Sequence, residues 1–264
     1  MTTKDRDALL KMAQSDDERI LIAKALDRAR QAELTGDFVT GDFHDPAELS
    51  RLTAVFAHRS GTARLHSYGG HPRAERKRAV FSPDGGAPDI ELYKLCAIEV
   101  RQRDSDARFV HPALLGALMS QGIKREKIGD IVVGDGLAWI IMDESLAERV
   151  TLTSVGRDAV TCSTCDLSAL ADYSPEMDSQ TVTVASLRLD AVLAAVFNLS
   201  RSDAVAAVNK GMVKVNHVPE DSVSRTLKEG DLVSLRGQGR TKLARIAGET
   251  RKGRIRLEME RPRR

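Results

Sequence analysis

The chain has 264 residues, which is enough for two or three domains that each bury a core. It contains no stretch of about 18 apolar residues that could cross a bilayer and no basic-then-apolar leader, so we expect a cytoplasmic protein without a membrane partner. The net charge of +2 conceals an asymmetry: residues 183–264 carry 17 Lys and Arg against 9 Asp and Glu, whereas the rest carries 23 against 29. The C-terminal third is therefore expected to face a polyanion.

Two helices are predicted near the N-terminus. Apolar residues recur at helical spacing over residues 16–34 and predict one helix there. Asp45 and Pro46 are typical of a helix start and predict a second helix over 46–56. Residues 35–43, TGDFVTGDF, are interpreted as the connection between them.

A basic loop completes this first module, which we place at residues 1–84 and expect to be mainly helical. Residues 67–83, SYGGHPRAERKRAVFSP, combine a glycine pair, at which another backbone can approach closely, with a cluster of cations. A solvated helix face is the simpler alternative. We interpret the cluster as a second phosphate contact made by Arg73, Arg76, Lys77 and Arg78.

The middle module, residues 85–180, is predicted to be an α/β layer of the ferredoxin or RNA-recognition-motif (RRM) type. Its elements follow the order β-α-β-β-α-β, with strands over 90–100, 128–133, 137–142, 151–155 and 159–162, a helix over 111–122 and a short helix from Glu144. RRM sheets stack bases on aromatic side chains. Tyr93 and Trp139 are the aromatic residues on its predicted strands, so we do not expect this sheet to read single strands.

Three cations crowd between the predicted helix and the following strand of this module. They are Lys124, Arg125 and Lys127. Cations at a helix end offset the negative end of its dipole, which is the structural alternative. Three cations are more than compensation of the helix dipole requires, so we interpret them as further residues of the second RNA contact.

The C-terminal module, residues 181–264, is predicted to have two short helices followed by a small sheet and a basic tail. Ser186 and Ser200 are expected to cap the helices, and Gly211 to end the second one. Arg188 and Arg201 then lie in the first helical turns, where backbone N–H groups and the helix dipole attract phosphate.

These residues resemble the S4 domain, an RNA-binding domain named after a protein of the small ribosomal subunit. The resemblance rests on RLD at 188–190, SR at 200–201, GMVKVN at 211–216, and GD at 230–231 followed by RGQGR at 236–240. Preceded by GGHPRAERKRA at 69–79 and HPALLGALMSQGIKREKIGD at 111–130, this domain makes the whole chain similar to the bacterial YlmH family.

The resemblance implies an α+β protein that binds RNA without catalysing a reaction. Its expected partners are ribosomal RNA of the large ribosomal subunit and transfer RNA or peptidyl-tRNA, in the rescue of stalled translation, and we expect a monomer. The implied RNA-binding residues are Arg188, Arg201, Ser202, Lys210, Lys214, Asn216, Arg236, Arg240 and Lys242.

Two alternatives stay open. S4 domains are also attached to RNA-modifying enzymes such as pseudouridine synthases and methyltransferases, and the N-terminal helices could dock another protein. The sequence motifs do not favour chemistry: Asp190 is explained as a first-turn helix charge, and Cys162 and Cys165 have no second pair of metal ligands nearby. We therefore predict no catalytic residue, no metal and no cofactor.

Overall fold

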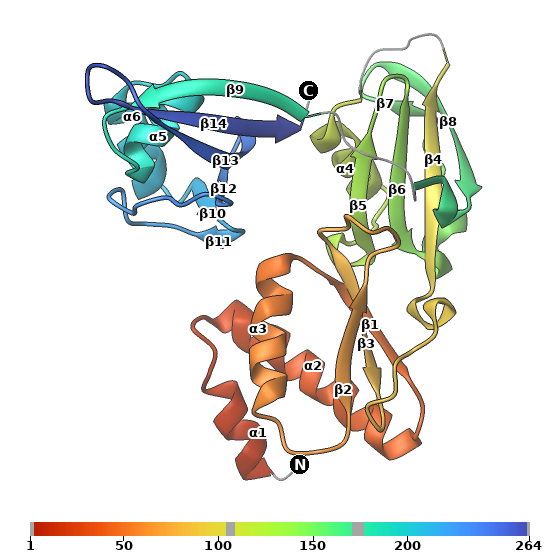
Figure 1. Cartoon of the computed structure of the whole chain (residues 1–264). Coiled ribbons are helices and arrows are strands. Elements are labelled where there is room, and N and C mark those ends of the chain that lie inside the picture. Colours follow the sequence, from red (N-terminus) through yellow and green to blue (C-terminus); the bar gives the residue numbers. More distant parts are fainter. Residues whose placement is uncertain (1–2, 104–108, 171–176, 263–264) are drawn as a thin grey trace. The chain divides into compact units, whose positions relative to one another are not determined.

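The structure of the chain is a computed structural model that describes residues 3–103, 109–170 and 177–262 (Figure 1). It divides into two compact units, Met1–Tyr173 and Ser174–Arg264. The first unit therefore joins the modules that the sequence separated at residue 84. The second unit begins ahead of the expected boundary at residue 180, because strand β9 (Met177–Val184) pairs along its length with β14 (Ile255–Pro262).

Helices and a three-stranded antiparallel sheet form the N-terminal part of the first unit. The helices are α1 (Thr3–Leu10), α2 (Asp16–Thr35) and α3 (Pro46–Ala57), and the sheet has the order β1-β3-β2 with β1 (Val39–His44), β2 (Arg64–Tyr68) and β3 (Lys77–Ser82). The two predicted helices are confirmed. Asp45 starts α3 through a capping box, because the Asp45 carboxylate accepts from the backbone N–H of Glu48 at 2.9 Å and the Glu48 carboxylate accepts from that of Asp45 at 2.9 Å.

The interpretation of residues 35–43 as a connection is wrong, because this segment contains most of β1. The basic loop likewise contains β3, the central strand of the same sheet. Gly41 suits β1 because a Cβ there would lie 3.1 Å from the carbonyl oxygen of Ala79. Asp42 suits it because its carboxylate pairs with Arg28 at 2.7 Å. Glycine and aspartate are turn formers in isolation, but here tertiary contacts decide their conformation.

The middle of the chain adds a five-stranded antiparallel sheet to the same unit. Its elements are η1 (Ile90–Tyr93), β4 (Leu95–Gln102), α4 (His111–Ser120), η2 (Arg125–Lys127), β5 (Ile128–Val133), β6 (Leu137–Asp143), η3 (Glu144–Arg149), β7 (Ser154–Val155), β8 (Asp158–Cys165) and η4 (Leu167–Leu170). The order β5-β6-β4-β8-β7 contains the ferredoxin-like arrangement that the sequence predicted, with β7 added at one edge. The second predicted helix is the 3-10 turn η3, and the strand expected from Ile90 starts at Leu95.

Both faces of this sheet are covered. Leu114 and Leu118 of α4 are fully buried against one face. Phe43, from β1 of the N-terminal sheet, packs against the other face together with Leu170 of η4. The two parts of the first unit therefore share a core, and part of the face on which RRM sheets stack bases is occupied by protein.

The second unit packs two helices on a six-stranded sheet of order β11-β10-β12-β13-β14-β9. Its remaining elements are α5 (Leu189–Val196), α6 (Arg201–Asn209), β10 (Val213–Val215), β11 (Val218–Pro219), β12 (Leu232–Leu235) and β13 (Gly239–Glu249). Within the described residues no single helix is long and apolar enough to cross a membrane, whereas α5 and α6 together, across a bend of 117°, satisfy that test by length and composition.

The starts of these two helices differ from each other. Ser200 caps α6 as predicted, since its hydroxyl accepts from the backbone N–H of Asp203 at 3.0 Å. Ser186 does not cap α5, which begins at Leu189. There the backbone N–H of Leu189 donates to the carbonyl of Arg225 at 2.8 Å instead, so a distant segment replaces the local cap.

Candidate nucleic-acid interface

Two arginines meet at the starts of α5 and α6. Arg188 immediately precedes α5, and Arg201 is the first residue of α6. Both lie against the carboxylate of Asp190, Arg188 at 3.2 Å and Arg201 at 2.9 Å. Asp190 is 3% exposed, whereas the side chains of Arg188 and Arg201 are 43% and 51% exposed. The buried carboxylate thus holds two cations together and leaves part of each guanidinium to solvent; we call these three residues the paired-arginine site.

Asp190 is ionised at neutral pH. Burial raises its pKa, but the hydrogen bonds from Arg188 and Arg201 outweigh burial and hold the pKa below its ordinary value. The site therefore carries one net positive charge, and the dipoles of the two helices add to its positive potential. Sequence reasoning treated Asp190 as a first-turn helix charge and missed its organising role, although its spacing of two residues from Arg188 was a local signal.

A second group of predicted residues lies on the sheet. Lys214 of β10, Ser234 of β12 and Arg240 of β13 are direct cross-strand neighbours. The residues that flank Lys214 along its strand are buried in the core with the helices, so by alternation this row points to the opposite face. Lys242, two residues beyond Arg240, is exposed on that face too. The predicted RNA contacts are therefore divided between two surfaces of the unit, the paired-arginine site and this sheet-face row.

The other predicted contacts in the second unit have different surroundings. Asn216 has a φ of +51°, and its side chain donates to Asp231 at 2.8 Å and accepts from the backbone N–H of Leu232 at 2.9 Å. Its amide is partly used inside the unit while the residue is exposed, so contact of Asn216 with RNA stays a prediction. The remaining three are exposed, and contact with RNA stays a prediction for Ser202, Lys210 and Arg236.

Three cations that were not assigned to the interface lie in the turn between β13 and β14. The segment expected to be a basic tail forms this turn and β14, which is paired on both sides. Arg251, Lys252 and Arg254 are exposed there. Arg254 donates to the carbonyl of Thr183 on β9 at 2.7 Å. The signal that could have revealed the turn was RKG before a run of alternating apolar residues at 255–259.

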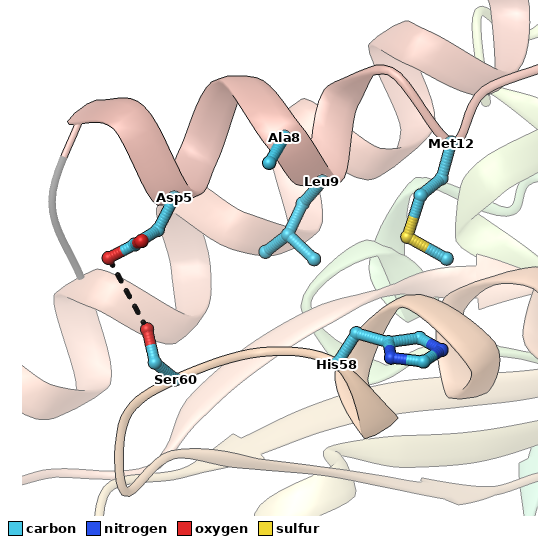
Figure 2. A pocket seen from close by; sticks show the side chains of 6 residues that line it. All are labelled: Asp5, Ala8, Leu9, Met12, His58 and Ser60. Atoms are coloured by element: carbon cyan, nitrogen blue, oxygen red, sulfur yellow. Dashed lines mark hydrogen bonds between the residues drawn. The ribbon is translucent and has the colours of Figure 1, made fainter.

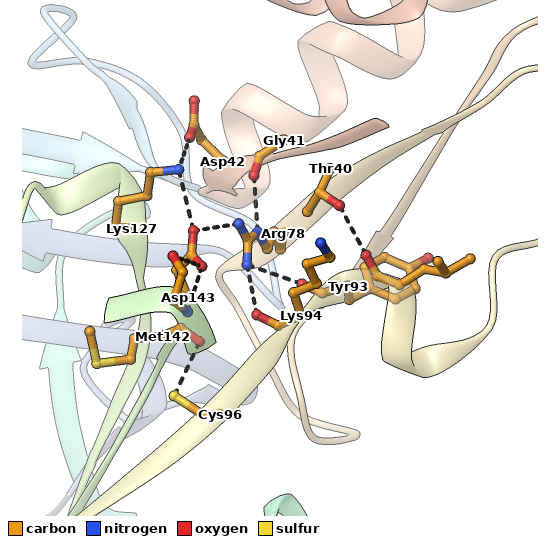
Figure 3. A network of polar contacts seen from close by, with 12 residues as sticks. Thr40, Gly41, Asp42, Arg78, Tyr93, Lys94, Cys96, Lys127, Met142 and Asp143 are labelled. Atoms are coloured by element: carbon orange, nitrogen blue, oxygen red, sulfur yellow. Dashed lines mark hydrogen bonds and ion pairs between the residues drawn. The ribbon is translucent and has the colours of Figure 1, made fainter. Parts of the chain in front are cut away.

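Most residues of the predicted second RNA contact instead form ion pairs and hydrogen bonds inside the first unit; we call this network of Arg76, Arg78, Arg125 and Lys127 the internal clasp. Arg78 is 4% exposed, and its guanidinium donates to the carbonyls of Gly41 at 3.0 Å and Lys94 at 2.7 Å and to the carboxylate of Asp143 (Figure 3). Lys127 lies between the carboxylates of Asp42, at 3.0 Å, and Asp143, at 3.3 Å. These contacts join β1 and β3 to the middle sheet. Arg78 and Lys127 are therefore corrected from RNA contacts to structural cations.

Arg76 and Arg125 belong to the same correction. Arg76 donates to the carbonyls of Ile128 and Phe43, each at 3.0 Å, and Arg125 donates to that of Ile128 at 2.8 Å. Burial and the neighbouring charge of Arg76 lower the pKa of Arg125 to about 10, so it stays charged at neutral pH while serving the interior. The guanidinium N–H groups of Arg76 and Arg125 therefore form hydrogen bonds with carbonyl groups at the junction of the two sheets.

The rest of that cluster is placed differently. Arg73 and Lys124 are exposed and Lys77 is half-buried opposite His44 on β1. Contact with RNA stays a prediction for these three.

The described residues of the first unit offer little that resembles a catalytic site. An open hollow of about 270 Å³ lies between α1 and the end of α3, with His58, Met12 and Ser60 in its lining, and Ser60 donates to Asp5 at 3.5 Å (Figure 2). Cys162 and Cys165 lie three residues apart on β8, so their thiols project to opposite faces of the sheet. Burial raises the pKa of both thiols, which keeps them protonated and poorly nucleophilic.

Family models match three segments of the chain. They are described as "YlmH, N-terminal" for residues 17–85, "Putative RNA-binding domain in YlmH" for residues 88–169 and "S4 domain" for residues 187–233. The matched segments follow the three parts of the structure in order.

A curated relative and a solved structure illustrate what the chain is similar to. The "Ribosome-associated protein quality control protein P2" of Bacillus subtilis is 38% identical over 247 residues, which cover 93% of this chain and 95% of the relative. The "Cell division protein ylmH from Streptococcus pneumoniae" has 18% identity and a TM-score of 0.50 over 61% of this chain and 98% of that one, and it supports the fold alone. The family models together with a relative of this identity and coverage show that the chain is a member of the YlmH family, with an RNA-binding S4 domain at its C-terminal end.

Proposed function

We propose that the chain acts as a monomeric adaptor that binds ribosomal RNA of the large subunit through its second unit, next to transfer RNA or peptidyl-tRNA, during rescue of stalled ribosomes. The observation that carries the proposal is the paired-arginine site, in which one buried carboxylate holds two half-exposed guanidinium groups at two helix starts. The name of the Bacillus subtilis relative supports the ribosomal partner and, with it, a cytoplasmic location.

The site is suited to phosphate rather than to base edges. Guanidinium groups bind phosphate oxygens in pairs, and the positive dipole ends of the two helices add attraction without sequence preference. Contacts of this kind fix the position and orientation of a protein on folded RNA, and the shape of the RNA then selects the place. The sheet-face row supplies a second strip of positive charge for another part of the RNA.

We propose further that the chain performs no catalysis. Arg125 and Lys127 of the middle module are engaged in the internal clasp, and the cysteines of β8 point apart. The rival is an RNA-modifying enzyme with an attached S4 domain. Mass analysis of ribosomal and transfer RNA from a strain that lacks the protein separates the two, because a missing modification would favour the enzyme.

Co-sedimentation with ribosomes tests the RNA-binding proposal. The double variant Arg188→Gln and Arg201→Gln keeps amide donors beside Asp190 but removes both charges. If each arginine contacts one phosphate of an RNA duplex, the log–log dependence of binding on salt should become shallower by about 2, following the value known for duplex DNA. Retention of wild-type binding and salt dependence would contradict the assignment.

The matched control is the double variant Arg19→Gln and Arg30→Gln. Both residues are exposed on α2 in the first unit, so the control removes the same charge from a surface that the proposal does not use. Binding is measured at a temperature at which circular dichroism shows both variants folded. The control should sediment with ribosomes as the wild type does.

A further inference from the structure

A hollow of about 320 Å³ opens on the second unit beside the paired-arginine site. Arg201, which belongs to that site, is part of its lining, and so is Arg254 from the turn between β13 and β14. These residues are 53 positions apart in the sequence, so the fold, and not local order, places them around one cavity. The hollow is open to solvent, and its volume suits one small group and not a helical segment.

Three alanines give the hollow an apolar part, which we call the alanine floor. Ala191, Ala194 and Ala195 line it. They lie on one face of α5 at spacings of three and four residues, where larger side chains would fill the space. Methyl groups present a surface without hydrogen-bonding groups that would select one base over another. The face of any base can be shielded from water against such a floor.

The rim of the hollow is positively charged. Arg201 is held by Asp190 at 2.9 Å with half of its side chain exposed, and Arg254 is held by its hydrogen bond to the carbonyl of Thr183 at 2.7 Å. Each guanidinium keeps donors beyond those used in these contacts. Two anchored cations and the alanine floor in one hollow match a ligand that has an apolar face and more than one anionic group.

We propose that this hollow receives one unpaired nucleotide of the bound RNA, with its base on the alanine floor and its flanking phosphates at Arg201 and Arg254. This inference rests on the proposed RNA-binding function and adds to it that the partner carries a bulged or unstacked nucleotide at this position. A continuous duplex does not meet that requirement, because its bases are paired and covered by their neighbours.

Filling the floor tests the proposal. The variants Ala194→Met and Ala195→Met, made separately, place a longer side chain in the hollow, and methionine is compatible with a helix. Two RNA hairpins serve as probes, identical except that one carries a single-nucleotide bulge. We expect the wild type to bind the bulged hairpin about tenfold more tightly, which corresponds to removing roughly 50 Å² of base surface from water. The filled variants should lose this preference, with unchanged affinity and salt dependence for the paired hairpin.

Two controls make the result specific. Ala206→Met introduces the same side chain on α6, outside the lining, and should keep the bulge preference. Arg254→Gln leaves the floor intact and should reduce the preference, whereas Lys252→Gln in the same turn should not.

The outcomes separate this inference from the proposed function. A wild type that binds both hairpins equally, or filled variants that keep the preference while folded, would overturn the nucleotide pocket and leave RNA binding in place. A wild type that binds neither hairpin nor ribosomes would overturn the proposed function itself and the pocket with it.

Discussion

Replacing Arg78 distinguishes a structural cation from an RNA contact. Arg78→Ala removes a side chain that is 5% exposed and paired with Asp143, whose side chain is 6% exposed. It also removes a hydrogen-bond donor from the carbonyl oxygens of Gly41, Tyr93 and Lys94, of which that of Lys94 still accepts from the backbone N–H of Glu144 at 3.0 Å. If Arg78 touched RNA instead, the same change would weaken binding and leave the stability of the first unit unaltered.

The magnitude follows from what the variant leaves behind. Removing one partner of a buried ion pair costs about 3–5 kcal/mol, because the other charge stays buried without compensation. Lys127 remains 3.3 Å from Asp143 and Ser145 donates to it at 2.8 Å, so we expect the lower end, about 3 kcal/mol. For a unit of this size that corresponds to a fall of roughly 6–12 °C in Tm. Arg78→Lys keeps the charge but not the forked geometry and should lose about half as much.

The single tryptophan makes the assay specific to the first unit. Trp139 lies on β6, so urea or thermal unfolding followed by its fluorescence reports this unit and not the second one. Lys124→Ala, an exposed cation from the same predicted RNA contact, is the control and should change stability by less than about 0.5 kcal/mol. An Arg78→Ala protein that unfolds like the wild type yet binds RNA less tightly would refute the reasoning.

Three further predictions concern other charges. Asp190→Asn should lower RNA affinity about tenfold, because the carboxylate that holds Arg188 and Arg201 together is lost. It should destabilise the second unit by about 1–2 kcal/mol, which is less than for a fully buried pair because both arginines are half-exposed. An RNA titration and a melting curve that both match the wild type would contradict this. The hydrogen bond from Arg59 lowers the pKa of Glu33 from 4.5 to about 2 against the opposing effect of burial, so this pair stabilises the first unit above pH 4.5 and the benefit is lost as the pH falls towards 2. Glu33→Gln should therefore cost about 1–2 kcal/mol at neutral pH, after allowance for solvent screening, and the gap to the wild type in Tm should close with acid; a gap independent of pH would show that the charge is not responsible. Lys214→Gln should reduce the salt dependence of RNA binding by about one phosphate contact without changing the melting temperature, and an unchanged slope would remove the sheet-face row from the interface.

Much of the architecture could be predicted because its signals are local. The start of α3 is recorded in Asp45, Pro46 and Glu48, and the start of α6 in Ser200 and Asp203, since capping uses residues within one helical turn. The β-α-β-β order of the middle sheet followed from apolar alternation in contiguous segments. The strand β1 was missed because Gly41 packs closely against Ala79 and Asp42 pairs with Arg28, and both partners are distant in sequence.

The sequence by itself determined that the chain has an S4 domain, that its last third is the cationic part, and that arginines stand at the starts of two helices. The tertiary structure decided which of the cations are available. Arg78 and Asp143 are 65 residues apart, and no local pattern records that one neutralises the other. The same holds for Arg201 and Arg254 around the alanine floor. Whether Arg78 can contact RNA depends on the carboxylate and carbonyl groups that folding packs beside it, and these come from strands that are distant in the sequence.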